Sequence, residues 1–338
     1  MNKMLLKEII EFKNGKKKPS SKGSIPIYGG NGILGYTDQN NQNGESLIIG
    51  RVGAYCGCVY SHYGKCWISD NAIVGKVNDG NDFYYCYYLL KRLNLNSRHV
   101  GSGQPLMTQE ILNNIEINIC DYATQRKIGK ILKNIDDKIK INNKINNNLY
   151  KLIKNNYESL INGCNWEEVE LGAISNVSSG KRPVDKSETG EYPVKYPVIG
   201  ANGIMAYASD YNFNEDLIIT GRVGTLGVVK RYLGKIWASD NTLVIQTKYL
   251  NYIENYLKTI DYYSLNRGST QPLLTQGDLK KQIIYFNEEL VTKFEKDNQI
   301  FVDKIKNNEK ENSKLIQLRD TLLPKLMNGE INLDNIEI

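Results

Sequence analysis

Gly50-Arg51-Val52-Gly53 and Trp67-Ile68-Ser69-Asp70-Asn71 decide the fold, because they return as Gly221-Arg222-Val223-Gly224 and Trp237-Ala238-Ser239-Asp240-Asn241. Three further blocks recur in the same order, at offsets of about 165 to 171 residues: Gly15-Lys16-Lys17-Lys18-Pro19 with Gly180-Lys181-Arg182-Pro183, Pro26 to Ile33 with Pro197 to Ile204, and Gly101 to Leu106 with Gly268 to Leu273. A period this long indicates two repeated domains rather than a solenoid. A duplicated domain in turn predicts pseudo-twofold symmetry.

The length and hydropathy of the chain exclude some classes of protein. Its 338 residues suffice for two or three domains of ~100 to 200 residues each. No apolar run approaches the ~18 residues that a membrane span needs. Residues 1–15 lack the apolar stretch and small residues of a secretory signal. We therefore expect a cytoplasmic protein.

The charge is distributed unevenly between the two copies. Residues 1–164 hold 22 Lys and Arg against 13 Asp and Glu, and residues 165–338 hold 21 against 24. A nucleic-acid-binding protein usually carries a basic patch. The first half meets this expectation weakly, and the second only through local clusters such as Lys181-Arg182 and Lys230-Arg231.

Each copy combines a β-rich part with a long helical segment. Up to about residue 120, and again from 165 to about 287, short β-rich runs punctuated by glycine predict a mixed α+β domain. Residues 124–162 and 288–328 instead carry apolar side chains at alternating steps of four and three, which predicts two long coiled-coil helices.

Two asparagine pairs interrupt the apolar seams of these helices. They are Asn142 and Asn146 in the first helix and Asn308 and Asn312 in the second. Antiparallel packing would place Asn142 opposite Asn312 and Asn146 opposite Asn308. A seam asparagine costs stability but fixes register, so we interpret this polar layer as a pin against sliding. The alternative is that asparagine is simply frequent in this chain.

The two helices differ near their ends. Pro324 occupies the position matched by Glu158, and an interior proline removes a backbone donor. We therefore expect the second helix to kink or end near Leu323. A helix of 40 residues is about 60 Å long, so we expect the first helix to hold the two domains apart.

Motifs that would indicate catalysis are incomplete. Gly30 to Gly35 satisfies G-x-G-x-x-G, but turn residues follow it and the second copy loses the pattern, so we expect a β-turn. His62 and His99 are the only histidines and have no counterparts in the second copy. The Ser-Asp-Asn blocks lack a Lys-Thr-Gly partner, so we expect them to be polar residues of turns and strand edges. No Asn-Pro-Pro-Tyr or Asp-Pro-Pro-Tyr methyltransferase motif occurs. These observations predict a non-catalytic chain that binds no cofactor itself.

The spacing of the cysteines in the first half is compatible with a zinc site. Three of them stand close together, and the matching positions of the second copy hold aliphatic residues. The cysteines are Cys56, Cys58 and Cys66, and their counterparts are Leu226, Val228 and Ile236. We therefore interpret these thiols as small buried hydrophobic side chains rather than metal ligands.

The repeated polar loops are candidates for contact with DNA. Arg51 and Arg222 stand between small residues that allow a partner to approach closely. Gln104 and Gln271 precede predicted helix caps at Thr108 and Thr275 and have the chemistry to read adenine or bind phosphate. The candidate phosphate clamps are Lys16, Lys17, Lys18, Lys181 and Arg182. In the alternative interpretation each arginine holds a carboxylate of its own domain and each glutamine ties down a loop. Identity between the copies favours such a scaffold role.

Four stretches carry a family resemblance. They are Thr124-Gln125-Arg126-Lys127-Ile128, Asp136-Asp137-Lys138-Ile139, Trp166 to Gly172 and Leu318 to Ile331. With them the chain resembles the specificity (S) subunit of a type I restriction-modification system over essentially its full length. The resemblance implies two target recognition domains, each reading one half of a bipartite DNA site, and two antiparallel helices that set the gap. It also implies two docked methyltransferase (M) subunits that use S-adenosylmethionine to methylate adenine N6, and a restriction (R) subunit that cleaves.

The expected fold class is α+β, with two repeated mixed α/β target recognition domains separated by two long antiparallel coiled-coil helices in pseudo-twofold symmetry. The expected boundaries are 1–122 and 164–288 for the recognition domains, 123–163 and 289–330 for the spacer helices, and 331–338 for a tail.

The chain departs from the family at Thr124, where a glutamate is usual, and in the second copy, where Glu288-Glu289-Leu290 replaces the Gln-Arg pair. The resemblance therefore leaves the strength of docking of the second methyltransferase open. The recognition domains also look small, which is compatible with a short or degenerate half-site. Two other functions stay open: a coiled-coil scaffold without DNA specificity, and a self-sufficient Mg-dependent nuclease using Asp70, Asp240 and their neighbours.

Overall fold

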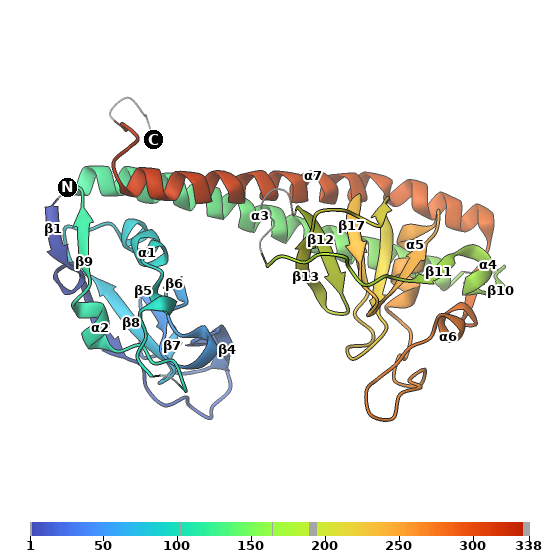
Figure 1. Ribbon diagram of the computed structural model, residues 1–338, viewed down its shortest axis with the longest axis horizontal. Coiled ribbons are helices and arrows are strands. Elements are labelled where there is room, and N and C mark those ends of the chain that lie inside the picture. Colours follow the sequence, from blue (N-terminus) through green and yellow to red (C-terminus); the bar gives the residue numbers. More distant parts are fainter. Residues whose placement is uncertain (1, 102, 164, 189–194, 334–338) are drawn as a thin grey trace. The chain divides into compact units, whose positions relative to one another are not determined.

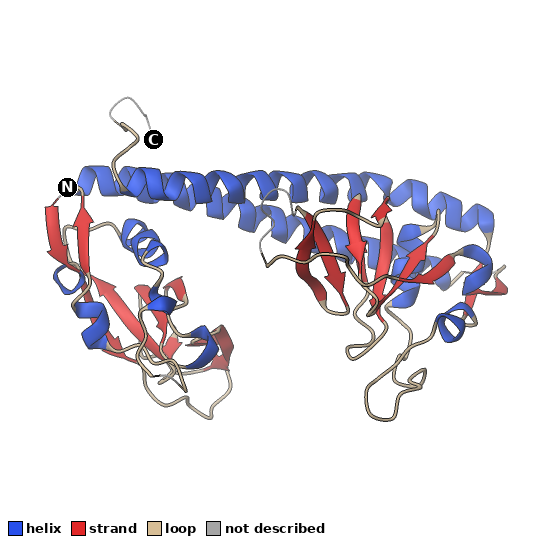
Figure 2. Cartoon of the chain, in the orientation of Figure 1, coloured by secondary structure: helices blue, strands red, loops and turns tan. Residues whose placement is uncertain are grey.

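The computed structural model describes residues 2–101, 103–163, 165–188 and 195–333 (Figure 1). The chain forms two compact units, which we call unit 1 (residues 1–143 with 309–338) and unit 2 (residues 144–308). Two helices of 40 residues, α3 (Tyr122–Ile161) and α7 (Glu288–Met327), contribute to both units. Figure 2 shows the strands grouped in two β-rich domains apart from these helices.

The described residues of unit 1 form three small sheets. The four-stranded antiparallel sheet has the order β2 (Ile10–Asn14), β8 (Ala72–Val77), β5 (Glu45–Gly50), β6 (Val59–Tyr63). The second has the order β4 (Gly32–Thr37), β3 (Ile25–Gly29), β7 (Trp67–Ile68), and the third pairs β1 (Asn2–Leu5) with β9 (Glu116–Ile119). The helices are α1 (Phe83–Arg92) and α2 (Gln109–Asn113), with 3-10 turns at Leu6–Glu8, Gly53–Tyr55 and Leu95–Ser97.

Unit 2 repeats this plan. Its sheets have the orders β11 (Asn176–Ser179), β18 (Thr242–Gln246), β15 (Leu217–Gly221), β16 (Lys230–Tyr232), and β13 (Gly203–Ala208), β12 (Tyr196–Gly200), β17 (Lys235–Ala238), β14 (Phe213–Asn214). A third sheet pairs β10 (Glu167–Glu170) with β19 (Ile283–Phe286), and the shorter helices are α4 (Leu171–Ile174), α5 (Leu250–Leu257) and α6 (Gln276–Lys280). The sequence repeat is therefore a repeat of structure.

Each domain packs on its own portions of the long helices. In unit 1, Tyr85 and Leu89 of α1 share one core with Leu132 of α3 and Leu326 of α7. In unit 2, the corresponding core joins α5 to Tyr157 of α3 and to α7. Each fully buried aliphatic or aromatic side chain stabilises such a core by about 1.5 to 3 kcal/mol. This packing explains why the seam side chains recur with a helical period.

Asparagine side chains pair across the antiparallel helices in both units. In unit 1, Asn142 Nδ2 donates to Asn312 Oδ1 at 3.0 Å. In unit 2, Asn308 Nδ2 donates to Asn146 Oδ1 at 2.7 Å. Both contacts that the heptad pattern predicts are thus present. Their role in fixing the register stays a prediction.

The second long helix does not end near Leu323, contrary to one of the two outcomes expected there. It continues through Pro324 to Met327, and the amide of Asn328 still donates to the Pro324 carbonyl at 3.0 Å. The proline removes a single backbone donor. Leu326 and Met327, which follow it, are buried in the core of unit 1, and we attribute the persistence of the last turn to this burial.

The turn predictions agree with the structure. Gly30 and Asn31 form the turn of the β3–β4 hairpin, and a strand rather than a helix follows them. Asp70 and Asn71 form the turn between β7 and β8. Thr108 caps α2 by accepting from the Ile111 amide at 3.1 Å. These glycine-rich and polar blocks therefore shape loops.

Cys56 and Cys66 lie among apolar side chains, as predicted, whereas Cys58 is only half-buried. Cys56 and Cys66 are buried in two different clusters, and burial raises the pKa of the Cys66 thiol to about 11. Cys164 falls outside the described residues. Within the described ranges no group of three or more His, Cys, Asp or Glu is placed to hold a metal ion. The described helices also include none that is long and apolar enough to cross a membrane.

Candidate nucleic-acid interface

The Ser-Asp-Asn turn is the centre of the candidate interface in unit 1. The Gly-Lys segment lies directly on it, because the Lys16 amide donates to the Ile68 carbonyl at 3.0 Å and Trp67 Nε1 donates to the Lys16 carbonyl at 3.3 Å. A Cβ added to Gly15 would lie 2.0 Å from the Ser69 oxygen. Only glycine permits this approach.

Arg51 joins the turn from the end of β5. Its amide donates to the Asn71 carbonyl at 2.9 Å, and its Nη1 donates to the Asp70 carbonyl at 3.2 Å. The partner of the guanidinium is therefore a backbone carbonyl, and among the described residues Arg51 has no ion pair. A guanidinium has five N–H donors, so this contact orients Arg51 while using one of them.

The Gln-Pro loop closes the other side of Arg51. The Gly53 amide donates to the Pro105 carbonyl at 3.0 Å, and the Met107 amide donates to the Arg51 carbonyl at 2.8 Å. Gly53 has a φ of +72°, a conformation that favours glycine. The side chain of Gln104 stays exposed at the surface of this loop.

Unit 2 contains the same arrangement. The Lys181 amide donates to the Ala238 carbonyl at 2.9 Å, and Arg222 Nη1 donates to the Asp240 carbonyl at 3.3 Å. The Gly224 amide donates to the Pro272 carbonyl at 2.9 Å. Thr275 caps α6, as predicted. The repeated blocks of the sequence thus converge on one turn in each unit, and we call each cluster a turn frame.

The loop that carries Gln271 has an additional anchor. Arg267 Nη2 lies 2.8 Å from Asp278 Oδ1 at the start of α6. Hydrogen bonds from Arg267 and from Thr275 lower the pKa of Asp278. The ion pair therefore persists at neutral and mildly acidic pH, and it fixes the base of the loop while Gln271 is exposed.

The candidate residues differ in exposure. The lysines and Arg182 of the Gly-Lys segments are exposed, as are both glutamines, whereas Arg51 and Arg222 are half-buried. Exposed cations suit contact with phosphate, because neutralising the phosphates releases the counterions condensed on DNA. The half-buried arginines are oriented in advance by the turn.

Adjacent residues of β16 have different environments, although the sequence presents them as one basic cluster. Lys230 is exposed, and its Nζ donates to the carbonyl of Asn202 in the β12–β13 turn at 3.2 Å. Arg231 points the opposite way, as successive side chains of a strand do, and its side chain is only 9% exposed. Lys230 is therefore an additional candidate for contact with DNA, which the sequence shows only as part of a basic cluster.

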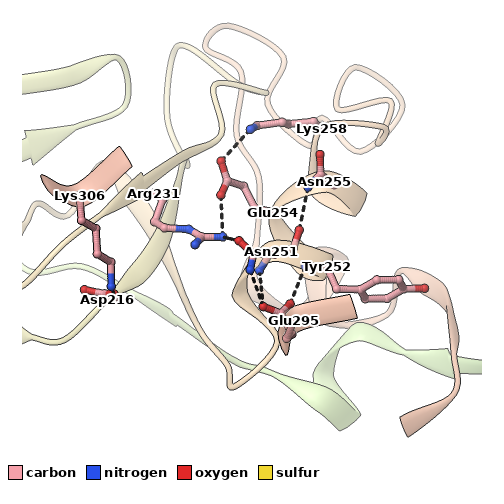
Figure 3. Close-up of polar contacts among 9 residues, drawn as sticks. All are labelled: Asp216, Arg231, Asn251, Tyr252, Glu254, Asn255, Lys258, Glu295 and Lys306. Carbon is pink, nitrogen blue, oxygen red and sulfur yellow. Dashed lines mark hydrogen bonds and ion pairs between the residues drawn. The ribbon is translucent and has the colours of Figure 1, made fainter. Parts of the chain in front are cut away.

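Arg231 belongs to a polar network that attaches the domain of unit 2 to α7 (Figure 3). Its Nη2 lies 2.9 Å from Glu254 Oε2 and 2.8 Å from Asn251 Oδ1, both on α5. Glu295 of α7 accepts from the amides of Asn251 and Tyr252 at 3.1 and 2.7 Å. Burial raises the pKa of Glu295, and these donors act against that shift.

A second contact attaches the same domain to α7. Lys306 of α7 pairs with Asp216, the residue before β15. Because β15 leads directly into Arg222, this ion pair and the network around Glu295 both hold the elements that support the turn frame.

Two β-rich domains of one design, each attached to a pair of long helices, define the class of protein. A model of the type I restriction modification DNA specificity domain matches residues 1–151 and 164–318. The chain therefore belongs to the family of type I restriction-modification DNA specificity subunits, a family whose members are non-catalytic.

Individual relatives agree with this assignment. The chain is 33% identical to the specificity subunit of the type I restriction enzyme EcoprrI from Escherichia coli over 111 residues, which cover 33% of this chain and only 28% of that subunit. It is 27% identical to the specificity subunit of the type I restriction enzyme MjaIX from Methanocaldococcus jannaschii over 310 residues, covering 76% of this chain and 71% of that subunit.

A solved structure shares the fold. The crystal structure of the S subunit of a type I restriction-modification system from M. genitalium matches with a TM-score of 0.67 at 19% identity. The match covers 96% of this chain and 95% of that one. The α+β architecture with paired long helices is thus the architecture of a known S subunit.

Proposed function

We propose that each β-rich domain reads one half of a bipartite DNA site, and that α3 and α7 set the gap between the halves. The observation that carries the proposal is the duplicated turn frame, which presents an oriented arginine, an exposed glutamine and exposed cations in both units. Two similar binding surfaces on one chain suit a target with two separate parts.

The chemistry of the frames fits duplex DNA. Exposed lysines and Arg182 supply charge for phosphates, which position a protein on DNA without reading sequence. Arginine and glutamine are the side chains that form paired hydrogen bonds with guanine and adenine in the major groove. Arg51, Arg222, Gln104 and Gln271 have this chemistry in equivalent places.

The helix pair serves as the spacer in this proposal, with the two domains in pseudo-twofold arrangement. The Asn142–Asn312 and Asn146–Asn308 contacts form together only in one register. A slip of one turn would keep one asparagine pair face to face and leave the other two amides opposite apolar seam residues such as Leu149 and Leu315. The gap between the half-sites would therefore be fixed.

The partners of the complex follow from the family. Two methyltransferase subunits dock on the helices and use S-adenosylmethionine to methylate adenine N6, and a restriction subunit joins them to cleave DNA. The assembly works in the cytoplasm. The chain contributes specificity to it and no catalytic group of its own.

Methylation mapping tests the proposal. DNA is sequenced from cells that produce a methyltransferase subunit of a type I system, with and without this chain. The expected result is a split adenine-methylated motif that appears only when the chain is present. Absence of any split motif would contradict the proposal and favour a scaffold that binds protein alone. Mg-dependent cleavage by the purified chain would instead support a self-sufficient nuclease.

A further inference from the structure

A β-bulge occurs at the same place in the β3–β4 hairpin of unit 1 and in the equivalent β12–β13 hairpin of unit 2. The pairing register shifts after Ile27 in the β3–β4 hairpin and after Val198 in the β12–β13 hairpin. The extra residue is Leu34 in the first hairpin and Met205 in the second. A bulge interrupts the alternation of a strand and re-aims a side chain, and bulges are frequent beside functional sites.

Each bulge leaves two consecutive apolar side chains exposed. Ile33 and Leu34 are 49% and 44% exposed, and Ile204 and Met205 are 58% and 50% exposed. They lie on β4 and β13, which are edge strands of their sheets. An exposed apolar edge strand is prone to aggregation, so its presence in both copies indicates a surface that a partner covers.

Glycines opposite the bulges make room for these side chains. A Cβ added to Gly29 would lie 2.4 Å from Leu34 Cδ1, and one added to Gly200 would lie 2.9 Å from Met205 Sδ. The bulged side chain therefore lies across the neighbouring strand close to the turn. The apolar surface is formed before any partner binds.

Cations flank both apolar surfaces. Lys18 Nζ is 3.7 Å from the position of a Cβ on Gly35, and Lys230 Nζ is 3.4 Å from that of a Cβ on Gly203. One ammonium group thus lies beside each hairpin, although the two lysines come from different parts of the repeat. We call each exposed apolar pair, Ile33-Leu34 or Ile204-Met205, an apolar ridge. An apolar ridge flanked by a positive charge complements a nucleic-acid groove, where phosphates border the base edges.

The hairpins also adjoin the turn frames. A Cβ on Gly50, the residue before Arg51, would lie 3.2 Å from the Gly30 carbonyl oxygen in the first hairpin turn. In unit 2, residues 200–205 of the hairpin line a cavity of about 350 Å³ together with Val223 and Asn241 of the turn frame. The apolar ridge and the arginine are therefore parts of one surface in each unit.

We propose that the two bulged hairpins, residues 29–36 and 200–207, enter the major groove and contact the 5-methyl groups of thymines with their exposed apolar pairs. This inference rests on the proposed function. The major groove, about 12 Å wide, admits a two-stranded ribbon, and the thymine methyl is its apolar feature. Lys18 and Lys230 contact the adjacent phosphates.

The hairpins also account for how two similar domains read different half-sites. The arginines and glutamines of the turn frames are the same in both copies, whereas the apolar pair is Ile33-Leu34 in one and Ile204-Met205 in the other. The flanking cation also comes from a different segment in each unit. The shared residues orient the domain on DNA, and the hairpins supply the difference.

Deoxyuridine scanning tests the inference, because uracil is thymine without its methyl group. The split motif is mapped first, and each adenine that is methylated guarantees one thymine on the opposite strand. The methyltransferase complex containing this chain is then titrated with duplexes that carry single thymine-to-uracil changes. For at least one position in each half we expect affinity to fall about fourfold, the effect of one buried methyl-sized group.

The matched variant is Ile33→Ala combined with Leu34→Ala. It should abolish the uracil effect in one half-site and leave the effect in the other half unchanged, which also shows that the complex is folded. Ile204→Ala with Met205→Ala should do the reverse. Ile283→Ala, an exposed isoleucine on β19, should change neither half.

The outcomes separate the two proposals. A uracil effect that persists in the hairpin variants, or no uracil effect at any position of a mapped split motif, would overturn the hairpin inference alone. Absence of a split motif would overturn the proposed function on which it rests.

Discussion

The short helices α1 and α5 occupy equivalent places in the two units but are attached to the long helices in different ways. In unit 1, Asp82 caps α1 by accepting from the Tyr85 amide at 2.8 Å, and Gln125 of α3 accepts from the Asp82 amide at 3.0 Å. In unit 2, the side chain of Tyr249, the residue before α5, accepts no hydrogen bond from the first amides of the helix, and Glu295 of α7 supplies the carboxylate instead. The carboxylate that caps the short helix therefore belongs to the β-rich domain in unit 1 (Asp82) and to the long helix α7 in unit 2 (Glu295).

Gly129 is the residue of α3 that is equivalent to Glu295, because the two are 166 residues apart, the same offset as between Asn142 and Asn308. This glycine explains why the capping carboxylate comes from a different element in each unit. A Cβ on Gly129 would lie 2.2 Å from Asp82 Oδ1, so the absence of a side chain there leaves space for the cap of α1. The N–H groups that begin a helix need acceptors in either case, and the two copies satisfy this need from opposite sides of the same contact.

The two copies thus differ where each domain meets the helices, whereas their turn frames are alike. In unit 1 a different contact attaches the domain to the long helices. Tyr88 Oη of α1 donates to Asp136 of α3 at 2.7 Å, and Arg319 of α7 pairs with the same carboxylate at 2.8 Å. Each domain is therefore matched to its own helix portions.

The largest effect is expected from Glu295→Gln. The glutamine has one acceptor oxygen for the amides of Asn251 and Tyr252, and its NH₂ group would face a donor. We expect the free energy of unfolding of unit 2 to fall by about 2 to 4 kcal/mol. Urea unfolding measures the loss, and hydrogen exchange should locate it in α5. Asp297→Asn, an exposed carboxylate two residues on, serves as control. A loss no larger than that of the control would contradict the capping role.

The corresponding link in unit 1 is tested by Arg319→Ala. The arginine side chain is 21% exposed, and its removal leaves Asp136 with Tyr88 as partner. We expect unit 1 to lose about 1 to 2 kcal/mol, less than unit 2 loses with Glu295. The stability of Arg319→Lys should lie between that of Arg319→Ala and that of the original chain, because lysine keeps the charge without the planar guanidinium. Equal stability of the alanine variant and the original chain would rule out this link.

Gly129→Ala tests the reciprocal exchange. Alanine in place of a helical glycine ordinarily gains up to about 1 kcal/mol. Here the new Cβ would displace the cap of α1, so we expect a net loss of about 1 kcal/mol in thermal or urea unfolding. The matched control is Gly277→Ala in α6, where the new Cβ would lie 3.8 Å from Thr275 Oγ1, and it should be neutral or stabilising. A gain at both positions would disprove the proposed exchange.

The smallest effect is expected from metal removal. Cys56 and Cys66 belong to different apolar clusters, and the raised pKa of Cys66, about 11, disfavours the thiolate that zinc needs. A chelator should therefore leave the Tm of unit 1 unchanged, as it leaves unit 2, which lacks these cysteines. A Tm that falls when chelator is added and recovers with zinc would support a zinc site instead.

The features that follow from local pattern were predictable from sequence. The repeat, the long helices, the facing Asn142 and Asn312, and the cap at Thr108 all depend on spacing within one or two segments. The prediction that the second helix could end near Leu323 was wrong, because the local propensity of Pro324 does not include the burial of Leu326 in the core.

Features that depend on tertiary pairing were not predictable. Arg231, Glu254 and Glu295 are far apart in sequence and meet only because β16, α5 and α7 pack together. The bulge at Leu34 requires the register of the hairpin. A bulky apolar pair directly after a glycine-rich turn was the one available signal, and it is equally compatible with a buried strand.

Methylation mapping with Arg51→Ala and Arg222→Ala in parallel decides whether the two turn frames serve separate half-sites. Each variant should relax or abolish recognition of one half of the split motif, a different half for each, while the gap is unchanged. Variants that alter the same half, or that leave both halves intact, would contradict it.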